Sequence, residues 1–272
     1  MADINLEGAS AWDTAVRYHE FKQNQPNKEL IKKARSIATA GVIRRAQQLL
    51  GSVSRSTLKK SVPLSEIQSL QDGEIDLDET LLSTDIWLTV EERRKHSIIL
   101  SVDTSLSMTG EKLALTAVAI AVVLLQFSED NVGVVVFDDS ARILKHPSEK
   151  TVLQKVIERF LDIPGRGYTN LEEGLKLSMK LAKQVTKGQR AGRRAATVLL
   201  TDGKYTAGSD PGYLADKFSK LILMQMGKDR AGTGLCSDLA RNGGGQVYRV
   251  PMLGSLPKIM YRVVKDLLIR SD

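Results

Sequence analysis

An apolar run that ends in closely spaced oxygen-bearing side chains constrains the fold of this chain more than any other stretch. Residues 97–102 have the length and composition of a buried strand, and Asp103, Ser105 and Ser107 follow at alternate positions. A long apolar stretch comes next, at residues 113–125. A buried strand that leads through a polar turn into a helix is typical of α/β proteins, which bind ligands at the carboxyl ends of their strands.

The side chains after this strand offer only oxygen atoms, the ligand chemistry of a hard cation such as Mg²⁺. Taken alone the motif is weak, because Asp and Ser in such a turn also satisfy backbone groups and cap helices. Two later loops have the same character, one before a helix at 170–186 and one after a strand at 196–200. A doubly wound sheet brings both loops beside the first strand. The sequence thus gathers two carboxylates and three hydroxyls, those of Asp103, Ser105, Ser107, Thr169 and Asp202.

The pattern from residue 97 onward alternates strands and helices, which predicts an α/β fold with a doubly wound, mostly parallel sheet and helices on both faces. The β-branched run 131–137 is followed so closely by the apolar segment 141–144 that no crossover helix fits between them. We therefore expect a hairpin there, with one antiparallel strand at an edge of the sheet. Further strands are expected at 196–200, 221–224 and 244–250, and a last helix at 256–269.

Three regions are predicted along the chain: a helical N-terminal extension (1–60), an acidic connecting segment (61–96) and the α/β domain (97–272). Helices are expected at 10–22 and 28–50. The second is expected to pack on the main domain, with a partner-binding role as the alternative. The serine-rich stretch up to Ser61 resembles a linker. The acids at 72–79 do not have the spacing of a calcium-binding EF-hand loop, so an exposed, structured segment is favoured.

Several classes of enzyme and membrane protein lack support in the sequence. Ser105 stands where a phosphate-transferring aspartate enzyme would carry a second Asp, the chain has no G-x-x-x-x-G-K-[ST] loop, and no histidine follows His146. The run 113–125 is too short to span a bilayer, and the polar N-terminus does not resemble a signal peptide. A single cysteine excludes an intrachain disulfide framework. We expect a cytoplasmic protein that is not an enzyme.

The net charge of +7 raises nucleic acid binding as an alternative function. The basic residues are spread out, however, and few aromatic residues lie among them. Solvated surfaces are therefore the favoured interpretation.

The strand, the three loops and the segment 239–248 resemble the von Willebrand factor type A (VWA) domain with its metal-ion-dependent adhesion site (MIDAS). The resemblance covers about residues 97–269. It implies that Asp103, Ser105, Ser107, Thr169 and Asp202 bind Mg²⁺, with Mn²⁺ or Ca²⁺ left open, and that an acidic side chain of a partner protein completes the coordination. Leu106 departs from the glycine that many members carry, at a position that is not a ligand.

The acidic segment 73–81 and the charged approach to the first strand look similar to an intracellular branch of this family, the CoxE-like proteins and the D-type subunits of magnesium chelatase. That resemblance implies a partner, an AAA+ ATPase of the MoxR or chelatase type, or a client of such an ATPase. The expected function is therefore an adaptor or cofactor subunit that recognises protein through a bound metal ion. A nucleic-acid-associated VWA protein and a metal-dependent hydrolase remain as alternatives.

Overall fold

The computed structural model describes residues 10–50, 57–66, 73–93, 96–105, 110–164, 167–187, 195–227 and 232–269. The chain forms two compact units. The larger unit comprises residues 1–51 and 96–264, and the smaller comprises residues 52–95 and 265–272. The predicted N-terminal helices therefore belong to the same compact unit as the α/β domain, while the division into three regions at residues 60 and 96 stays a prediction.

The larger unit is built on a six-stranded sheet with the order β6-β5-β4-β7-β8-β9. All neighbours are parallel except β5 and β6, which form the expected antiparallel hairpin at one edge. The strands are β4 (Ser97–Asp103), β5 (Asn131–Phe137), β6 (Ala141–Lys145), β7 (Ala195–Thr201), β8 (Lys220–Met226) and β9 (Val247–Val250). The predicted fold class is confirmed.

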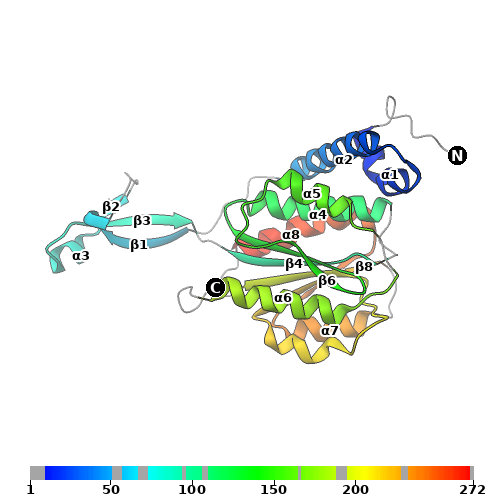
Figure 1. Ribbon diagram of the computed structural model, residues 1–272. Coiled ribbons are helices and arrows are strands. Elements are labelled where there is room, and N and C mark those ends of the chain that lie inside the picture. Colours follow the sequence, from blue (N-terminus) through cyan, green and yellow to red (C-terminus); the bar gives the residue numbers. More distant parts are fainter. Residues whose placement is uncertain are drawn as a thin grey trace. The chain divides into compact units, whose positions relative to one another are not determined.

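Helices cover both faces of this sheet (Figure 1). One face carries α4 (Glu111–Gln126), α5 (Leu153–Leu161) and α8 (Leu256–Ile269), and the other carries α6 (Leu171–Thr186) and α7 (Thr233–Asn242). Every residue of α4 from Leu113 to Leu124 is buried. A helix that is apolar on all sides must be covered on all sides, and α2 packs on α4 as a further layer (Figure 1).

The N-terminal helices are α1 (Ala11–Asn24) and α2 (Lys28–Leu49), and each begins at a polar cap. The Ser10 hydroxyl accepts a hydrogen bond from the Asp13 amide, and the Asn27 side chain accepts one from the Glu29 amide. The buried residues of α2 include four small side chains spaced four residues apart: Ala34, Ala38, Val42 and Ala46. Small residues let a helix approach its neighbours closely, so α2 packs on the main domain as the sequence predicts.

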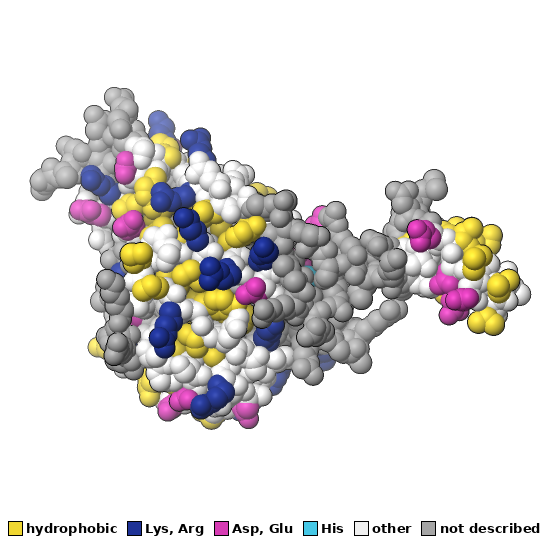
Figure 2. Space-filling view, turned by 180° about the vertical axis from the view of Figure 1, so that it is seen from behind, with side chains coloured by type: hydrophobic (Ala, Val, Ile, Leu, Met, Phe, Trp, Pro, Cys, Tyr) yellow, Lys and Arg dark blue, Asp and Glu magenta, His cyan; other side chains and the backbone are white. Residues whose placement is uncertain are grey.

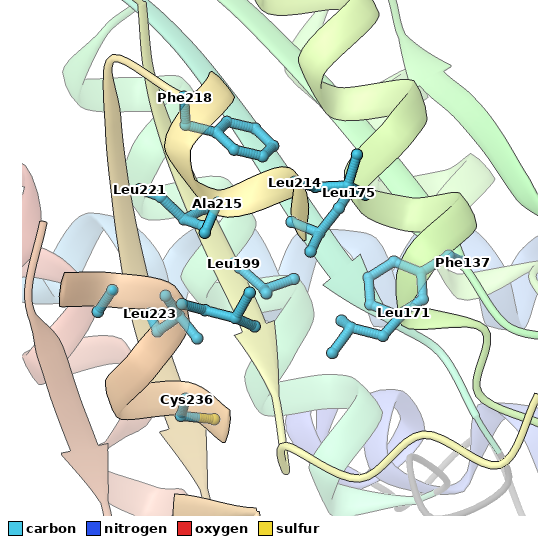
Figure 3. Close-up of a cluster of buried hydrophobic side chains, with 12 residues drawn as sticks. Phe137, Leu171, Leu175, Leu199, Leu214, Ala215, Phe218, Leu221, Leu223 and Cys236 are labelled. Atoms are coloured by element: carbon cyan, nitrogen blue, oxygen red, sulfur yellow. The ribbon is translucent and has the colours of Figure 1, made fainter. Parts of the chain in front are cut away.

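Between the sheet and the helices of the second face lies a cluster of buried side chains (Figure 3). It joins Phe137 at the end of β5 to Leu171 and Leu175 on α6 and to Leu199 on β7. The short 3₁₀ helix η2 (Pro211–Lys217), which sequence analysis does not anticipate, contributes Leu214 and Ala215. This cluster packs α6, α7 and η2 against β5, β7 and β8.

The smaller unit contains a three-stranded antiparallel sheet in the order β1-β3-β2. Its elements are β1 (Thr57–Pro63), η1 (Leu64–Glu66), β2 (Gly73–Ile75), α3 (Leu77–Leu82) and β3 (Trp87–Arg93). The predicted linker is therefore wrong from Thr57 onward, because this stretch pairs with β3 along its whole length. The acidic segment is exposed and structured, as predicted, and forms β2 and α3.

Among the described residues, no helix combines the length and the apolar character needed to cross a membrane.

Candidate metal site at the carboxyl end of β4

The connections of the sheet diverge at β4. The chain passes from β4 through α4 to β5 on one side, and later returns to place β7 on the other side. Asp103 is opposite Phe137 of β5, and Val102 is opposite Leu200 of β7. Such a switch point leaves an opening outside the carboxyl ends of the strands, where α/β proteins bind ligands.

Asp103 is the buried centre of this edge, with only 2% of its surface exposed. Its Oδ1 accepts a hydrogen bond from the Ser105 amide at 3.0 Å, and its Oδ2 accepts one from the Thr201 hydroxyl at 3.1 Å. Burial raises the pKa of the Asp103 carboxyl to about 6; the charge of Asp202 acts in the same direction, and hydrogen bonds from Ser105 and Thr201 oppose it. A positive charge at this position would favour the ionised carboxylate.

The turn after β4 is held against β5. Both the amide and the hydroxyl of Thr104 donate to the Phe137 carbonyl, at 2.8 and 3.0 Å. The next residue, Ser105, is also buried, with 6% of its surface exposed. This predicted ligand therefore lies beside Asp103, whereas Ser107 lies outside the described residues.

The loop before α6 is tied to the loops on both sides of it. The Thr169 amide donates to the Thr206 hydroxyl at 2.9 Å, and the Thr206 amide donates to the Thr169 carbonyl at 3.0 Å. The Asn170 amide donates to the Asp138 carbonyl at 2.6 Å. Thr169 is buried, with 6% of its surface exposed. Because it exchanges two hydrogen bonds with Thr206, its position depends on the loop after β7 as well as on its own helix.

Asp202 follows β7 at a sharp turn that only glycine allows. Gly203 has a φ of +81°, and a Cβ there would lie 2.7 Å from the Cys236 sulfur and 2.8 Å from the Gly232 carbonyl oxygen. The Asp202 Oδ1 accepts a hydrogen bond from the Lys204 amide at 3.0 Å. Asp202 itself is partly exposed. Because β7 lies next to β4 and parallel to it, this second carboxylate is at the same edge of the sheet as Asp103.

Thr201 belongs to this arrangement, although sequence reasoning missed it. It is buried, and its hydroxyl donates to the Asp103 carboxylate while accepting from the Gly203 amide at 3.1 Å. One hydroxyl thereby links the ends of β4 and β7. The sequence does place Thr201 directly before Asp202. A threonine at the end of an apolar run is usually interpreted as a strand residue, because threonine is common in strands.

The described donors in this arrangement are two carboxylates and neutral hydroxyls. Within the described part of the chain there is no group of three or more His, Cys, Asp or Glu side chains that could hold an ion. Zinc sites are typically built from His and Cys, whereas this oxygen set suits Mg²⁺, Mn²⁺ or Ca²⁺. The residues therefore fit a hard cation, and their role as ligands stays a prediction.

Comparisons with known proteins agree with this architecture. A family model described as von Willebrand factor type A domain matches residues 98–204. No curated protein matches the chain.

Solved structures of the same fold are similar at low sequence identity. Proximal thread matrix protein 1 from the mussel byssus is 19% identical, with a TM-score of 0.53 over 62% of this chain and 47% of that one. A form of that protein with a zinc-occupied MIDAS motif is 20% identical, with a TM-score of 0.53 over 64% and 48%. A von Willebrand factor type A protein from Catenulispora acidiphila is 12% identical, with a TM-score of 0.52 over 80% and 51%.

This chain spans about half the length of the mussel byssus protein that it matches. The narrower resemblance to CoxE-like proteins stays a prediction. The family model and the sheet order together show that residues 98–204, in the larger unit, are similar to a von Willebrand factor type A domain.

Proposed function

We propose that this chain is a metal-dependent protein-interaction module that binds Mg²⁺ through Asp103, Ser105, Ser107, Thr169 and Asp202 and recognises an acidic side chain of a partner protein. The observation that carries the proposal is the buried Asp103 carboxylate next to a second carboxylate, Asp202, among hydroxyl groups. The mussel byssus protein with zinc in its MIDAS motif supports the choice of a divalent ion. Mn²⁺ and Ca²⁺ are the alternatives to Mg²⁺.

The residues of this chain contribute different groups to the proposed site. Asp103 and Asp202 supply negative charge, and Ser105 and Thr169 supply neutral oxygen. Thr201 holds the Asp103 carboxylate in place from β7. When bound, Mg²⁺ supplies an open coordination position that a carboxylate from another protein can take, since this ion prefers six oxygen ligands. These groups would bind a partner without a chemical step, so we propose no catalytic residue.

Calorimetric titration of Mg²⁺ tests the site. Asp103→Asn and Asp202→Asn should each weaken binding by about a hundredfold or more, because a full negative charge is lost next to the cation. Ser105→Ala should weaken binding less, since it removes a neutral ligand. Asp238→Asn, a change of the same kind on the exposed surface of α7, is the matched control. Equal affinities in all variants would reject the site.

The sequence resemblance leads us to propose an AAA+ ATPase, or a protein that such an ATPase remodels, as the partner. Native cell extract passed over the immobilised protein, in Mg²⁺ and in chelator, tests this. We expect an AAA+ ATPase to be retained by the wild type in Mg²⁺ and lost in chelator or on an Asp202→Ala column. Retention that is unchanged in chelator would reject the metal bridge. If the wild type retains proteins in Mg²⁺ but no AAA+ ATPase is among them, the proposed class of partner is rejected and the metal bridge is not.

A further inference from the structure

A second surface of the chain, far from the metal ligands in sequence, has the composition of a binding surface. It consists of exposed aliphatic side chains with acids between them, and we call it the acidic leucine surface. Its members are Ile75, Leu77, Leu81, Leu82, Ile86, Glu74, Asp78, Glu79 and Asp85. Figure 2 shows hydrophobic and acidic side chains together on the small unit. Leu81 and Leu82 are 82% and 84% exposed, and large exposed apolar clusters usually mark interaction sites.

The helix α3 is oriented opposite to an ordinary surface helix. Thr80 and the cap residue Asp76 tie it to β3: the Trp87 amide donates to the Thr80 hydroxyl at 2.9 Å, and the Asp76 amide donates to the Trp87 carbonyl at 2.9 Å. The α3 residues Leu77, Leu81 and Leu82 face solvent, and none of the helix is buried. Surface helices normally turn their apolar side toward the core. Polar contacts thus hold α3 so that its leucines point outward.

The charge around these leucines specifies what can cover them. Residues 73–90 contain five acids and no Lys or Arg. The rest of the chain is basic, and Figure 2 shows Lys and Arg side chains among exposed apolar side chains over one face of the larger unit. On α8, Lys258 and Arg262 lie one turn apart and are exposed, with the partly exposed Ile259 between them. We call Lys258, Ile259 and Arg262 the basic surface of α8. This chain therefore carries an acidic surface with exposed leucines and a basic surface with one partly exposed apolar side chain.

We propose that the acidic leucine surface of one copy docks on the basic surface of α8 in a second copy of this chain. Burial of the leucines supplies the attraction, and the acids paired with Lys258 and Arg262 select the partner surface. The metal ligands take no part in this contact, so the proposal stands independently of the proposed function.

Sedimentation velocity of the full chain, from low to high micromolar concentration, tests this proposal. At low ionic strength the wild type should associate, and at about 1 M salt, where the Debye length is about 3 Å, association should weaken. Changing Leu81 and Leu82 together to serine should weaken association by about a hundredfold. Both side chains are exposed, so this variant should fold, and circular dichroism checks that. The control is Val152→Ser, an aliphatic residue 65% exposed on the larger unit. A wild type that sediments as a monomer at every concentration would overturn the proposal.

A pair of charge reversals tests which surfaces meet. Glu79→Lys and Arg262→Glu should each weaken self-association, because each places like charges opposite one another. A mixture of the two variants should associate again, since the lysine introduced in one copy then faces the glutamate introduced in the other. Glu129→Lys makes the same charge change at an exposed position outside the surface and should have no such effect. A mixture that does not associate would overturn the pairing with α8.

Discussion

Gly174 on α6 lies directly against the ring of Phe137, at the end of the strand next to Asp103. A Cβ at residue 174 would lie 2.5 Å from the ring carbon Cδ1 of Phe137, well inside van der Waals contact. Phe137 is completely buried in the cluster of Figure 3 and cannot move aside without disturbing its neighbours. The glycine therefore sets how closely α6 approaches the sheet.

Gly174→Ala should destabilise the larger unit by about 1–3 kcal/mol, because the extra methyl group overpacks the cluster. Gly234, on α7, is the matched control: its Cβ would meet nothing within 4 Å. There the change to alanine should be neutral or stabilise the protein by about 0.5–1 kcal/mol through helix propensity. Chemical denaturation of the two variants and the wild type measures both effects. Equal stability of the two variants would contradict the packing argument.

Asp103 combines a proposed role in metal binding with an environment that is unfavourable for a charged group. A carboxylate that is 2% exposed loses most of its hydration. We expect Asp103→Asn to leave the metal-free protein as stable as the wild type, or more stable, because the amide keeps the size and carries no charge. Mg²⁺ should raise the melting temperature of the wild type, since a ligand that binds only the folded state stabilises it, and should leave that of Asp103→Asn unchanged. Calorimetric melting with and without Mg²⁺ measures this, and an equal rise in both proteins would refute it.

At the scale of elements, Asp162 joins the N-terminal helices to the end of α5. Tyr18 and Lys22 of α1 donate to its Oδ1 at 2.8 and 2.9 Å, and Arg35 of α2 donates to its Oδ2 at 2.5 Å. Burial alone would raise the pKa of Asp162, but the hydrogen bonds from these three residues outweigh it, so the pKa lies below its ordinary value. One carboxylate thus connects three helices.

Asp162→Asn should destabilise the larger unit at neutral pH by about 1–3 kcal/mol, because charge-assisted hydrogen bonds are lost. The pKa of Asp162 is lower in the folded than in the unfolded state. Its contribution is therefore present above the unfolded-state pKa and is lost as the pH falls through the folded-state pKa. The difference between wild type and variant should shrink toward acid pH. Urea denaturation across a pH series measures it, and a difference independent of pH would count against this account.

At the scale of the whole molecule, the two compact units differ in how much apolar surface they bury. The larger unit buries nearly all of β4, β5, β7 and β8. Among the hydrophobic side chains described between residues 61 and 90, only Val90 is buried, with 5% of its surface exposed. A three-stranded sheet with so small a core has little stability of its own.

Hydrogen exchange followed by mass spectrometry should show this difference. Amides of β1 and β3 should exchange about two orders of magnitude faster than those of β4 and β7, because local opening of the small sheet exposes little apolar surface. If the acidic leucine surface is covered by a second copy, protection of α3 should also rise with protein concentration. Equal protection of the two sheets would contradict the difference in stability.

The sequence by itself determined the order and type of the long helices and sheet strands of the larger unit, although not the short helix η2. It also predicted five oxygen-bearing residues at one edge of the sheet, of which the structure describes four. These features are local: apolar runs give strands and helices, a short gap forces a hairpin, and polar residues after parallel strands share an edge. Even the internal helix α4 follows from its unbroken apolar composition.

Only the tertiary structure decided which distant side chains meet. Thr201 donates to Asp103 across 98 positions, and Tyr18 reaches Asp162 across 144. The strand β1 exists because β3 lies beside it, although its own residues resemble a linker. The outward leucines of α3 likewise depend on polar contacts with β3. Contacts of this kind depend on which faces of folded elements pack together. A short stretch of sequence does not determine that packing, because the contacting residues lie far apart in the chain.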